Sequence, residues 1–274
     1  MWGDRAVHRS QRVTLWQAVL LGMLQGVTEF LPVSSSGHLA LAQMLIPGFN
    51  QPGVVFDVML HVGTAIAVLW FERHELVRWL ASAAGRRLLG LLVLGTLATA
   101  VVAMPLRHIA QDAFTRPVLV ACFLVVTGLV VGATRFLRGG AKGEGETSWR
   151  EVAIVGLAQG LAIFPGLSRS GLTISVGLGV GLERTWVARF SFLLAIPAIA
   201  CVAVVELLTA GGEAAAPGAH FWLACGVGAV SAAVSGYFAL RLVIRAVSSR
   251  VFHRFAWYCL PLGILVLVLV LGGR

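Results

Sequence analysis

Long apolar stretches without charged residues constrain the fold of this chain more than any other feature of its sequence. Three of the clearest are Pro117–Thr134, Phe221–Leu240 and Phe255–Leu271. Each approaches the roughly 20 residues that an α-helix needs to cross the hydrocarbon core of a bilayer. Only 12% of the 274 residues are charged, whereas a soluble domain carries about 25%. The chain is therefore predicted to be an all-α polytopic membrane protein forming a single membrane domain, 1–274.

Six segments are predicted to be complete transmembrane helices: about 54–71, 88–106, 117–135, 187–208, 220–240 and 255–272. Two further apolar stretches, Val13–Leu31 and Trp149–Phe164, are each broken by a Pro- and Ser-containing segment and followed by only a short apolar arm. Broken helices of this kind are tolerated in a membrane where the backbone is buried in protein or lines a cavity. We expect two re-entrant helical hairpins.

The two broken stretches belong to an internal repeat. An offset of 134 residues carries Gln25, Phe30, Ser34, Ser36 and Gly37 onto Gln159, Phe164, Ser168, Ser170 and Gly171. Three predicted spans separate the copies, and this odd number inverts the second copy relative to the first. The repeats are predicted to cover 13–136 and 149–272. Inverted repeats with broken helices place a binding site near the bilayer midplane, where the repeats meet.

The positive charges give the expected orientation. With both termini on one side, 14 of the 21 Lys and Arg residues fall on the opposite side and six on the terminal side, and Arg169 lies within the membrane. The side richer in Lys and Arg is expected to be cytoplasmic. Because the basic residues are spread over short loops, the net charge of +9 reads as a topology signal, and we expect no nucleic-acid partner.

Ionisable residues inside membrane segments are expensive and usually functional. Glu29 lies in the first broken helix, and its spacing from Gln25 places both side chains on one helix face. His38 follows directly after the break. An alternative for Glu29 is a capping or helix-pairing role, but a neutral residue would do this at a lower desolvation cost. Asp57 and His61 also have helical spacing, and we expect them to pair in a supporting role.

The serines at each break are candidates for anion binding. Ser34, Ser36, Ser168 and Ser170 lie where a second helix begins, and a helix N-terminus favours phosphate or carboxylate groups. Plain helix capping is the alternative for each serine. Arg169 lies between the serines of the second break, where a buried guanidinium needs an anionic partner and matches phosphate oxygens.

Thr173, four residues after Arg169, offers a further hydroxyl to such a phosphate pocket. Helix packing is an equally good account of this threonine.

The repeat is asymmetric in its chemistry. At the same offset, Glu29 falls on Ile163, Ser35 on Arg169 and His38 on Leu172. A hydrolase needs this division between a nucleophile with its base and a cation that binds phosphate. A carrier that moves a lipid phosphate across the bilayer is the alternative that the architecture also fits. A purely structural subunit would leave the buried Glu29 and Arg169 unexplained.

Two motifs resemble the signatures of the bacterial undecaprenyl pyrophosphate phosphatases, also called bacitracin-resistance phosphatases. They run from Gln25 to His38 (QGVTEFLPVSSSGH) and from Pro165 to Thr173 (PGLSRSGLT). The segments FDVMLHVGT at 56–64 and RFSFLLAIP at 189–197 match as well. The resemblance covers nearly the whole chain in the same order.

The resemblance implies a hydrolase of the inner membrane that converts undecaprenyl diphosphate to the monophosphate, recycling the carrier lipid of cell-wall synthesis. It also implies a divalent cation, Mg²⁺ or Ca²⁺, and a site that opens to the periplasm. By position, Gln25 and Glu29 match a (Glu/Gln)-xxx-Glu motif, in which Glu29 is the candidate metal ligand. Gln25 is an amide and can only coordinate or orient.

The same comparison assigns roles around the second half of the first motif. Ser34, Ser35 and His38 match Ser-Ser-x-Gly-His, and Arg169 matches the arginine of Ser-Arg-Ser-Gly. We expect Glu29, Ser35, His38 and Arg169 to be catalytic, with Ser35, His38 or water as the nucleophile. The expected partners are a polyprenyl diphosphate and membrane lipids, and a homodimer stays open as the assembly.

Overall fold

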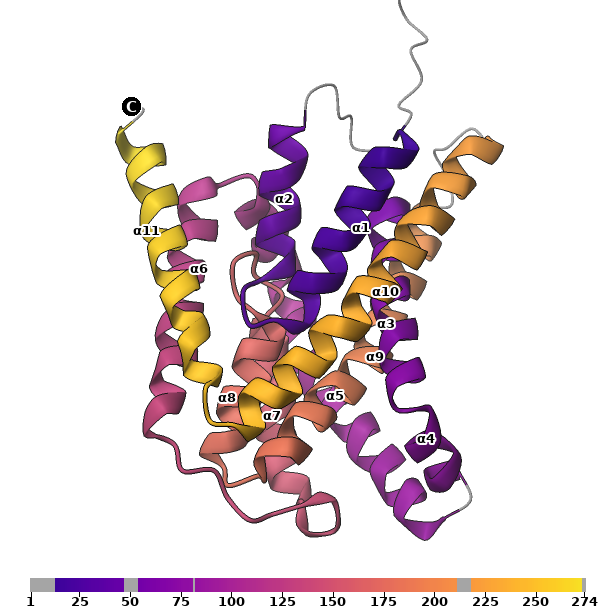
Figure 1. The fold of residues 1–274 in the computed structure, drawn as a ribbon, viewed down its shortest axis with the longest axis vertical. Helices are drawn as coiled ribbons and strands as arrows, with labels where there is room; N and C mark the ends of the chain where they lie inside the picture. Colours follow the sequence, from indigo (N-terminus) through magenta and orange to yellow (C-terminus); the bar gives the residue numbers. More distant parts are fainter. Residues whose placement is uncertain (1–12, 47–53, 81, 211–217, 273–274) are drawn as a thin grey trace, which may run out of the picture.

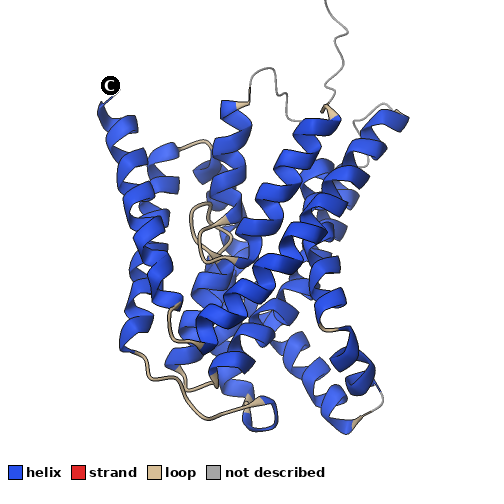
Figure 2. Cartoon of the chain, in the orientation of Figure 1, coloured by secondary structure: helices blue, strands red, loops and turns tan. Residues whose placement is uncertain are grey.

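The computed structural model describes residues 13–46, 54–80, 82–210 and 218–272, and the elements that it shows over these ranges are helices (Figure 2). The helices of the first half are α1 Leu15–Phe30, α2 Ser35–Leu45, α3 Val54–Phe71, α4 Arg73–Leu80, α5 Ala83–Phe114 and α6 Pro117–Ala133. Those of the second half are α7 Trp149–Leu161, α8 Arg169–Gly179, α9 Arg184–Ala210, α10 Ala219–Ser248 and α11 Ala256–Gly272. Short 3₁₀ turns cover 134–136, 144–146 and 252–255.

The predicted spans are confirmed as helices. Over the described residues, five helices are long and apolar enough to cross a membrane, and α3 with α4 makes a sixth candidate that bends by 70° between its two parts. α5 extends well beyond the expected 88–106, because its 32 residues continue through Pro105. The protein is an all-helical polytopic membrane protein. Arg5, Arg9 and Arg12, which counted toward the predicted orientation, lie outside the described residues.

The two broken stretches form helical hairpins that approach each other from opposite ends of the molecule. Figure 1 shows α1 and α2 in the upper half and α7 and α8 in the lower half, with the turns of both hairpins near the middle. α1 packs on α2, α7 packs on α8, and α1 also contacts α8. This arrangement agrees with the expected re-entrant hairpins, while the boundaries of the two repeats remain a prediction.

Helices of the two halves pack on each other in a reciprocal pattern. α1 packs on α10, and α7, its counterpart in the repeat, packs on α5. Small residues allow close approach at both places: a Cβ on Gly22 would lie 2.3 Å from Gly228 O, and one on Gly156 would lie 2.4 Å from Gly95 O. Gly22 and Gly156 are related by the 134-residue offset. Glycine contacts of this kind let membrane helices pack backbone to backbone.

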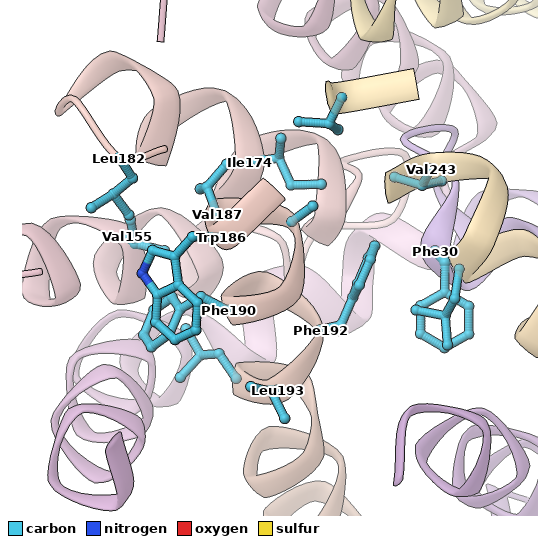
Figure 3. Packing of buried hydrophobic residues seen from close by; sticks show 14 of the residues in the cluster. Phe30, Val155, Ile174, Leu182, Trp186, Val187, Phe190, Phe192, Leu193 and Val243 are labelled. Carbon is cyan, nitrogen blue, oxygen red and sulfur yellow. The ribbon is translucent and has the colours of Figure 1, made fainter. Parts of the chain in front are cut away.

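Large apolar side chains fix the end of α1 against the second half. Phe30, the last residue of α1, is fully buried and meets Phe192 of α9 edge to face, with ring centroids 5.3 Å apart. Figure 3 shows both rings in the main core cluster, which continues through Phe190 and Trp186. Because Glu29 precedes Phe30, this packing holds the predicted catalytic carboxylate at a defined position between the halves.

Candidate functional site

The turns of the two hairpins are bonded directly to each other. Gly166 N in the second turn donates to Ser34 Oγ in the first at 3.1 Å. In return, Ser170 Oγ donates to Leu31 O at 3.1 Å. Thr127 of α6 ties down the second turn, since its hydroxyl donates to Gly166 O at 2.9 Å and accepts from Ser168 N at 3.0 Å. Residues far apart in the sequence therefore form one site near the centre of the molecule.

Local sequence chemistry explains the shape of each turn. Ser34 caps α2 by accepting from Gly37 N at 3.3 Å, and its backbone has φ +69°, a region that non-glycine residues seldom occupy. Such backbone strain clusters at functional sites. In the second turn, Ser168 caps α8 by accepting from Gly171 N at 3.1 Å. Gly166 has φ +99°, and a Cβ there would lie 2.2 Å from Val120 O. Both helices thus begin at the site.

Glu29 is the centre of the polar cluster, and its side chain is almost completely buried. Its Oε2 accepts from Gln25 Nε2 at 2.9 Å and from Ser35 Oγ at 2.7 Å. Its Oε1 lies 2.7 Å from Arg169 Nη2, and His61 Nε2 is 3.7 Å from Oε2. A buried carboxylate is tolerated when a cation and hydrogen bonds compensate its charge. Here one carboxylate collects groups from α1, α2, α3 and α8.

Arg169, the first residue of α8, is held in place from two sides. Besides the ion pair with Glu29, its Nη1 donates to Ser191 O at 3.2 Å. Thr173 supports this arrangement, because its hydroxyl donates to Arg169 O at 2.8 Å and lies 2.6 Å from Ser191 Oγ. The guanidinium is therefore aimed by α9 as well as by the carboxylate. This placement holds the guanidinium beside the Glu29 carboxylate at the meeting point of the two hairpins.

Ser35 has the geometry of an activated hydroxyl. A nucleophilic hydroxyl requires a base within about 2.6–3.2 Å, and Ser35 Oγ lies 2.7 Å from Glu29 Oε2. In this arrangement the Ser35 hydroxyl donates a hydrogen bond to Glu29 Oε2. Glu29, the candidate metal ligand of the sequence analysis, therefore also lies next to the serine.

Both ring nitrogens of His38 form hydrogen bonds. Nδ1 lies 2.8 Å from Ser34 O, and Nε2 lies 2.7 Å from the hydroxyl of Tyr258 on α11. Because a carbonyl oxygen can only accept, Nδ1 carries a proton, and in the neutral imidazole Nε2 then accepts from Tyr258. The two rings also stack, with centroids 5.6 Å apart. The role of His38 as a proton carrier remains a prediction.

The other predicted binding residues also lie at the two turns. Ser34, Ser168, Ser170 and Thr173 are buried, and their hydroxyls make the caps and cross-links described above. Ser36 lies at 3.4 Å from Ser34, oxygen to oxygen. The serine hydroxyls therefore hold the two turns in place. Their contact with a bound phosphate remains a prediction.

His61 and Tyr258 contact residues of the candidate site, which their sequence context did not indicate. His61 was expected to pair with Asp57 in a supporting role, and its Nδ1 does lie 2.9 Å from the backbone oxygen of Asp57, while its Nε2 is 3.7 Å from Glu29 Oε2. The Asp57 carboxylate accepts from Gln43 Nε2 at 3.0 Å. Tyr258 gave no signal of its own, because nothing in the repeat or the motifs singles out a tyrosine in the last span.

The protein side chains alone do not enclose a metal ion. Within the described parts of the chain, no three His, Cys, Asp or Glu side chains lie close enough to hold one. Glu29 is the carboxylate at the centre, and Gln25 Oε1 beside it is buried without a hydrogen-bond partner. Mg²⁺ usually keeps several waters and binds through one or two carboxylates together with substrate phosphates, and Gln25 offers an amide oxygen beside the Glu29 carboxylate. Glu29 and Gln25 Oε1 fit this kind of shared site.

Comparison with known proteins agrees with the two motifs. A family model described as Bacitracin resistance protein BacA matches residues 18–265. The chain belongs to the BacA family. Its relatives include an undecaprenyl-diphosphatase of Syntrophotalea carbinolica, 44% identical over 90% of this chain and 95% of that protein. An undecaprenyl-diphosphatase of Gemmatimonas aurantiaca is 40% identical over 93% of this chain and 97% of its own length.

Proposed function

We propose that this protein is an integral membrane hydrolase that converts undecaprenyl diphosphate to undecaprenyl phosphate and so recycles the carrier lipid of cell-wall synthesis. The observation that carries the proposal is the joining of Ser35, Glu29 and Arg169, in which a hydroxyl bonds to a buried carboxylate that is paired with a guanidinium. A nucleophile, its base and a phosphate-binding cation then lie within one cluster. The family membership and the names of the relatives support the same reaction.

The reaction would divide between the two halves of the chain. Arg169 and the N-termini of α2 and α8 bind the terminal phosphate, and Ser35 Oγ or a water that it orients attacks the phosphorus atom. Glu29 accepts the proton of the attacking group. The phosphorus–oxygen bond to the inner phosphate breaks, and lipid monophosphate leaves. If Ser35 itself attacks, water then releases inorganic phosphate from the serine; His38 supplies or takes the proton that completes the cycle.

A divalent cation, Mg²⁺ or Ca²⁺, is part of this proposal. Glu29 and Gln25 Oε1 would hold it together with oxygens of the diphosphate, and the ion would neutralise negative charge on the phosphates. The orphaned Gln25 oxygen supports this placement.

We further propose that the protein lies in the bacterial inner membrane with both termini and the site opening on the periplasmic side. The linker 137–148 carries Arg138 and Lys142, and the α10–α11 connection carries Arg250 and Arg254. Both segments lie toward the lower end in Figure 1, away from the end of α11. Positive loops favour the cytoplasm. Reporter fusions within 139–147 should therefore report the cytoplasm, and fusions after Arg274 should report the periplasm. The reverse pattern would overturn the orientation. Assembly into a homodimer remains a prediction.

The deciding experiment is phosphate release from a prenyl diphosphate by the purified protein, with and without a chelator. Release that depends on the added cation and is lost in Ser35→Ala supports hydrolysis. If the wild-type protein releases no phosphate but moves the lipid between leaflets of a vesicle, the chain is a carrier instead.

A further inference from the structure

A hollow with a volume of 430 Å³ lies away from the catalytic cluster and has no part in the proposed hydrolysis. It forms where the segment after α6, the α8–α9 connection and the end of α10 meet, at the lower end of the molecule in Figure 1. α8 leads from Arg169 in the cluster toward this end, and its 11 residues correspond to a length of roughly 16 Å. The hollow is therefore a separate feature of the fold.

Three arginines dominate the charge of this hollow, which we call the basic pocket: Arg138, Arg184 and Arg250. The acidic residue among its lining residues, Glu183, already caps α9 by accepting from Thr185 N at 2.9 Å and from Trp186 N at 2.6 Å. Within the described ranges, none of the three arginines forms an ion pair with an acidic side chain. With three arginines and one glutamate among its lining residues, the pocket carries a net positive charge.

Arg184 distinguishes the pocket from ordinary exposed loop arginines, because only 9% of its surface is exposed. Its Nη2 donates to Leu137 O at 2.5 Å and its Nη1 to Val247 O at 3.4 Å, while its Nε is buried without a partner. The charge of Arg250 opposes that of Arg184, and the charge of Glu183 partly offsets this repulsion. Holding two like charges together is unfavourable unless an anion offsets their repulsion.

The walls of the pocket are preformed by backbone contacts. Gly140 N donates to Leu182 O at 3.1 Å, and Glu183 N donates to Lys142 O at 2.9 Å. A Cβ on Gly140 would lie only 1.6 Å from Gly181 O, so the two segments meet without room for a side chain. A preformed site loses less entropy on binding than one that must be assembled.

We propose that the basic pocket binds a phosphate group, through Arg138, Arg184 and Arg250, at the membrane surface opposite the catalytic opening. Guanidinium groups match phosphate oxygens in geometry and charge. The volume falls within the roughly 300–1,000 Å³ of small-ligand sites. The phosphate belongs either to a free phosphate ion or to the headgroup of an anionic lipid, since α9 and α10 bring the pocket to the end of membrane-spanning helices.

The test measures phosphate binding to the full chain in phosphatidylcholine nanodiscs by calorimetry. All proteins carry Arg169→Ala, which removes the phosphate-binding guanidinium of the catalytic cluster and so weakens binding there equally in every variant. The double variant Arg138→Gln/Arg250→Gln is compared with Arg254→Gln, an exposed arginine nearby that does not line the pocket. Arg138 and Arg250 are exposed, so their substitution should leave the fold intact, which thermal unfolding checks. One arm uses inorganic phosphate, and the other uses dioctanoyl phosphatidylglycerol.

We expect saturable binding of at least one probe, unchanged in Arg254→Gln and weakened about tenfold or more in the double variant, because each lost guanidinium removes a charged hydrogen bond. Saturation by inorganic phosphate identifies a free-anion site, and saturation by the lipid alone identifies a headgroup site. Equal affinity in the double variant and in Arg254→Gln would overturn the proposal. Absence of saturable binding of both probes would overturn it as well.

Discussion

Arg169 and Glu29 are 140 residues apart in the sequence, and Arg169 Nη2 lies 2.7 Å from Glu29 Oε1. This ion pair joins the end of α1 in the first hairpin to the start of α8 in the second. It also means that an entering phosphate must share or displace the carboxylate partner of the arginine. Phosphate binding by Arg169 is therefore expected to depend on the number and direction of its N–H donors as well as on its positive charge.

We expect Arg169→Lys to be nearly as damaging as Arg169→Ala. A lysine keeps the charge but cannot bond Glu29, Ser191 O and a phosphate oxygen together with a planar fork. Both variants should lower kcat/KM for lipid diphosphate hydrolysis by roughly 10²–10³-fold, the usual cost of losing a donor to a developing oxyanion.

Arg189→Lys is the matched control for this prediction. Arg189 also directs its fork at a buried carboxylate, that of Glu72, with Nε 2.8 Å from Oε1, but it lies outside the catalytic cluster. The substitution Arg189→Lys should lower thermal stability and leave kcat/KM of the folded protein near the wild-type value. Near-normal hydrolysis by Arg169→Lys would show that Arg169 acts only as a diffuse charge.

Ser35→Ala tests the hydroxyl that bonds to Glu29. Removing this group should lower kcat by about 10²–10⁴-fold, while binding of the lipid diphosphate stays close to normal because Arg169 and the helix N-termini remain. Ser36→Ala is the neighbouring control, since the Ser36 hydroxyl makes a long 3.4 Å contact with Ser34. This substitution should affect binding more than kcat. Steady-state hydrolysis and a separate binding assay on the same variants distinguish the effects. Full hydrolysis by Ser35→Ala would remove Ser35 from the mechanism.

The sequence predicted the helices and the position of the site better than its internal geometry. The apolar runs gave the spans, since lipid permits only internally bonded helices there, and the serines and prolines marked both turns. The sequence predicted that the two repeats meet at one site, but it did not predict that Arg169 pairs with Glu29. The acceptor for Ser35 and the partner of His38 depend on packing between distant helices. A local sequence pattern does not show which side chains of distant helices contact one another, so the sequence did not predict the contact between Tyr258 and His38.

The His38–Tyr258 pair gives a prediction that follows from the structure alone. Tyr258→Phe removes the hydroxyl that lies 2.7 Å from His38 Nε2 but keeps the ring that stacks on the imidazole. If the hydroxyl positions a working His38, Tyr258→Phe should lower kcat by about tenfold or less and shift the pH profile of kcat. Its effect should vanish in a His38→Ala background, because residues in one network are not additive. Independent, additive losses would show that Tyr258 does not act through His38.

The last prediction concerns the divalent cation at Gln25 and Glu29. Glu29→Gln should raise the cation concentration needed for half-maximal hydrolysis in addition to lowering kcat, because it replaces a charged oxygen ligand by a neutral amide. Gln25→Glu should be tolerated, since a carboxylate at this position offers the cation an oxygen where Gln25 Oε1 now lies without a partner. Without the cation, however, Gln25→Glu would bury two carboxylates beside one arginine, a costly arrangement. We therefore expect its activity and thermal stability to fall more steeply than those of the wild type when a chelator is added. Hydrolysis titrated with Mg²⁺ and with Ca²⁺, together with thermal unfolding in the presence and absence of chelator, measures both effects. If Glu29→Gln and Gln25→Glu both keep the cation dependence of the wild type, the cation binds elsewhere.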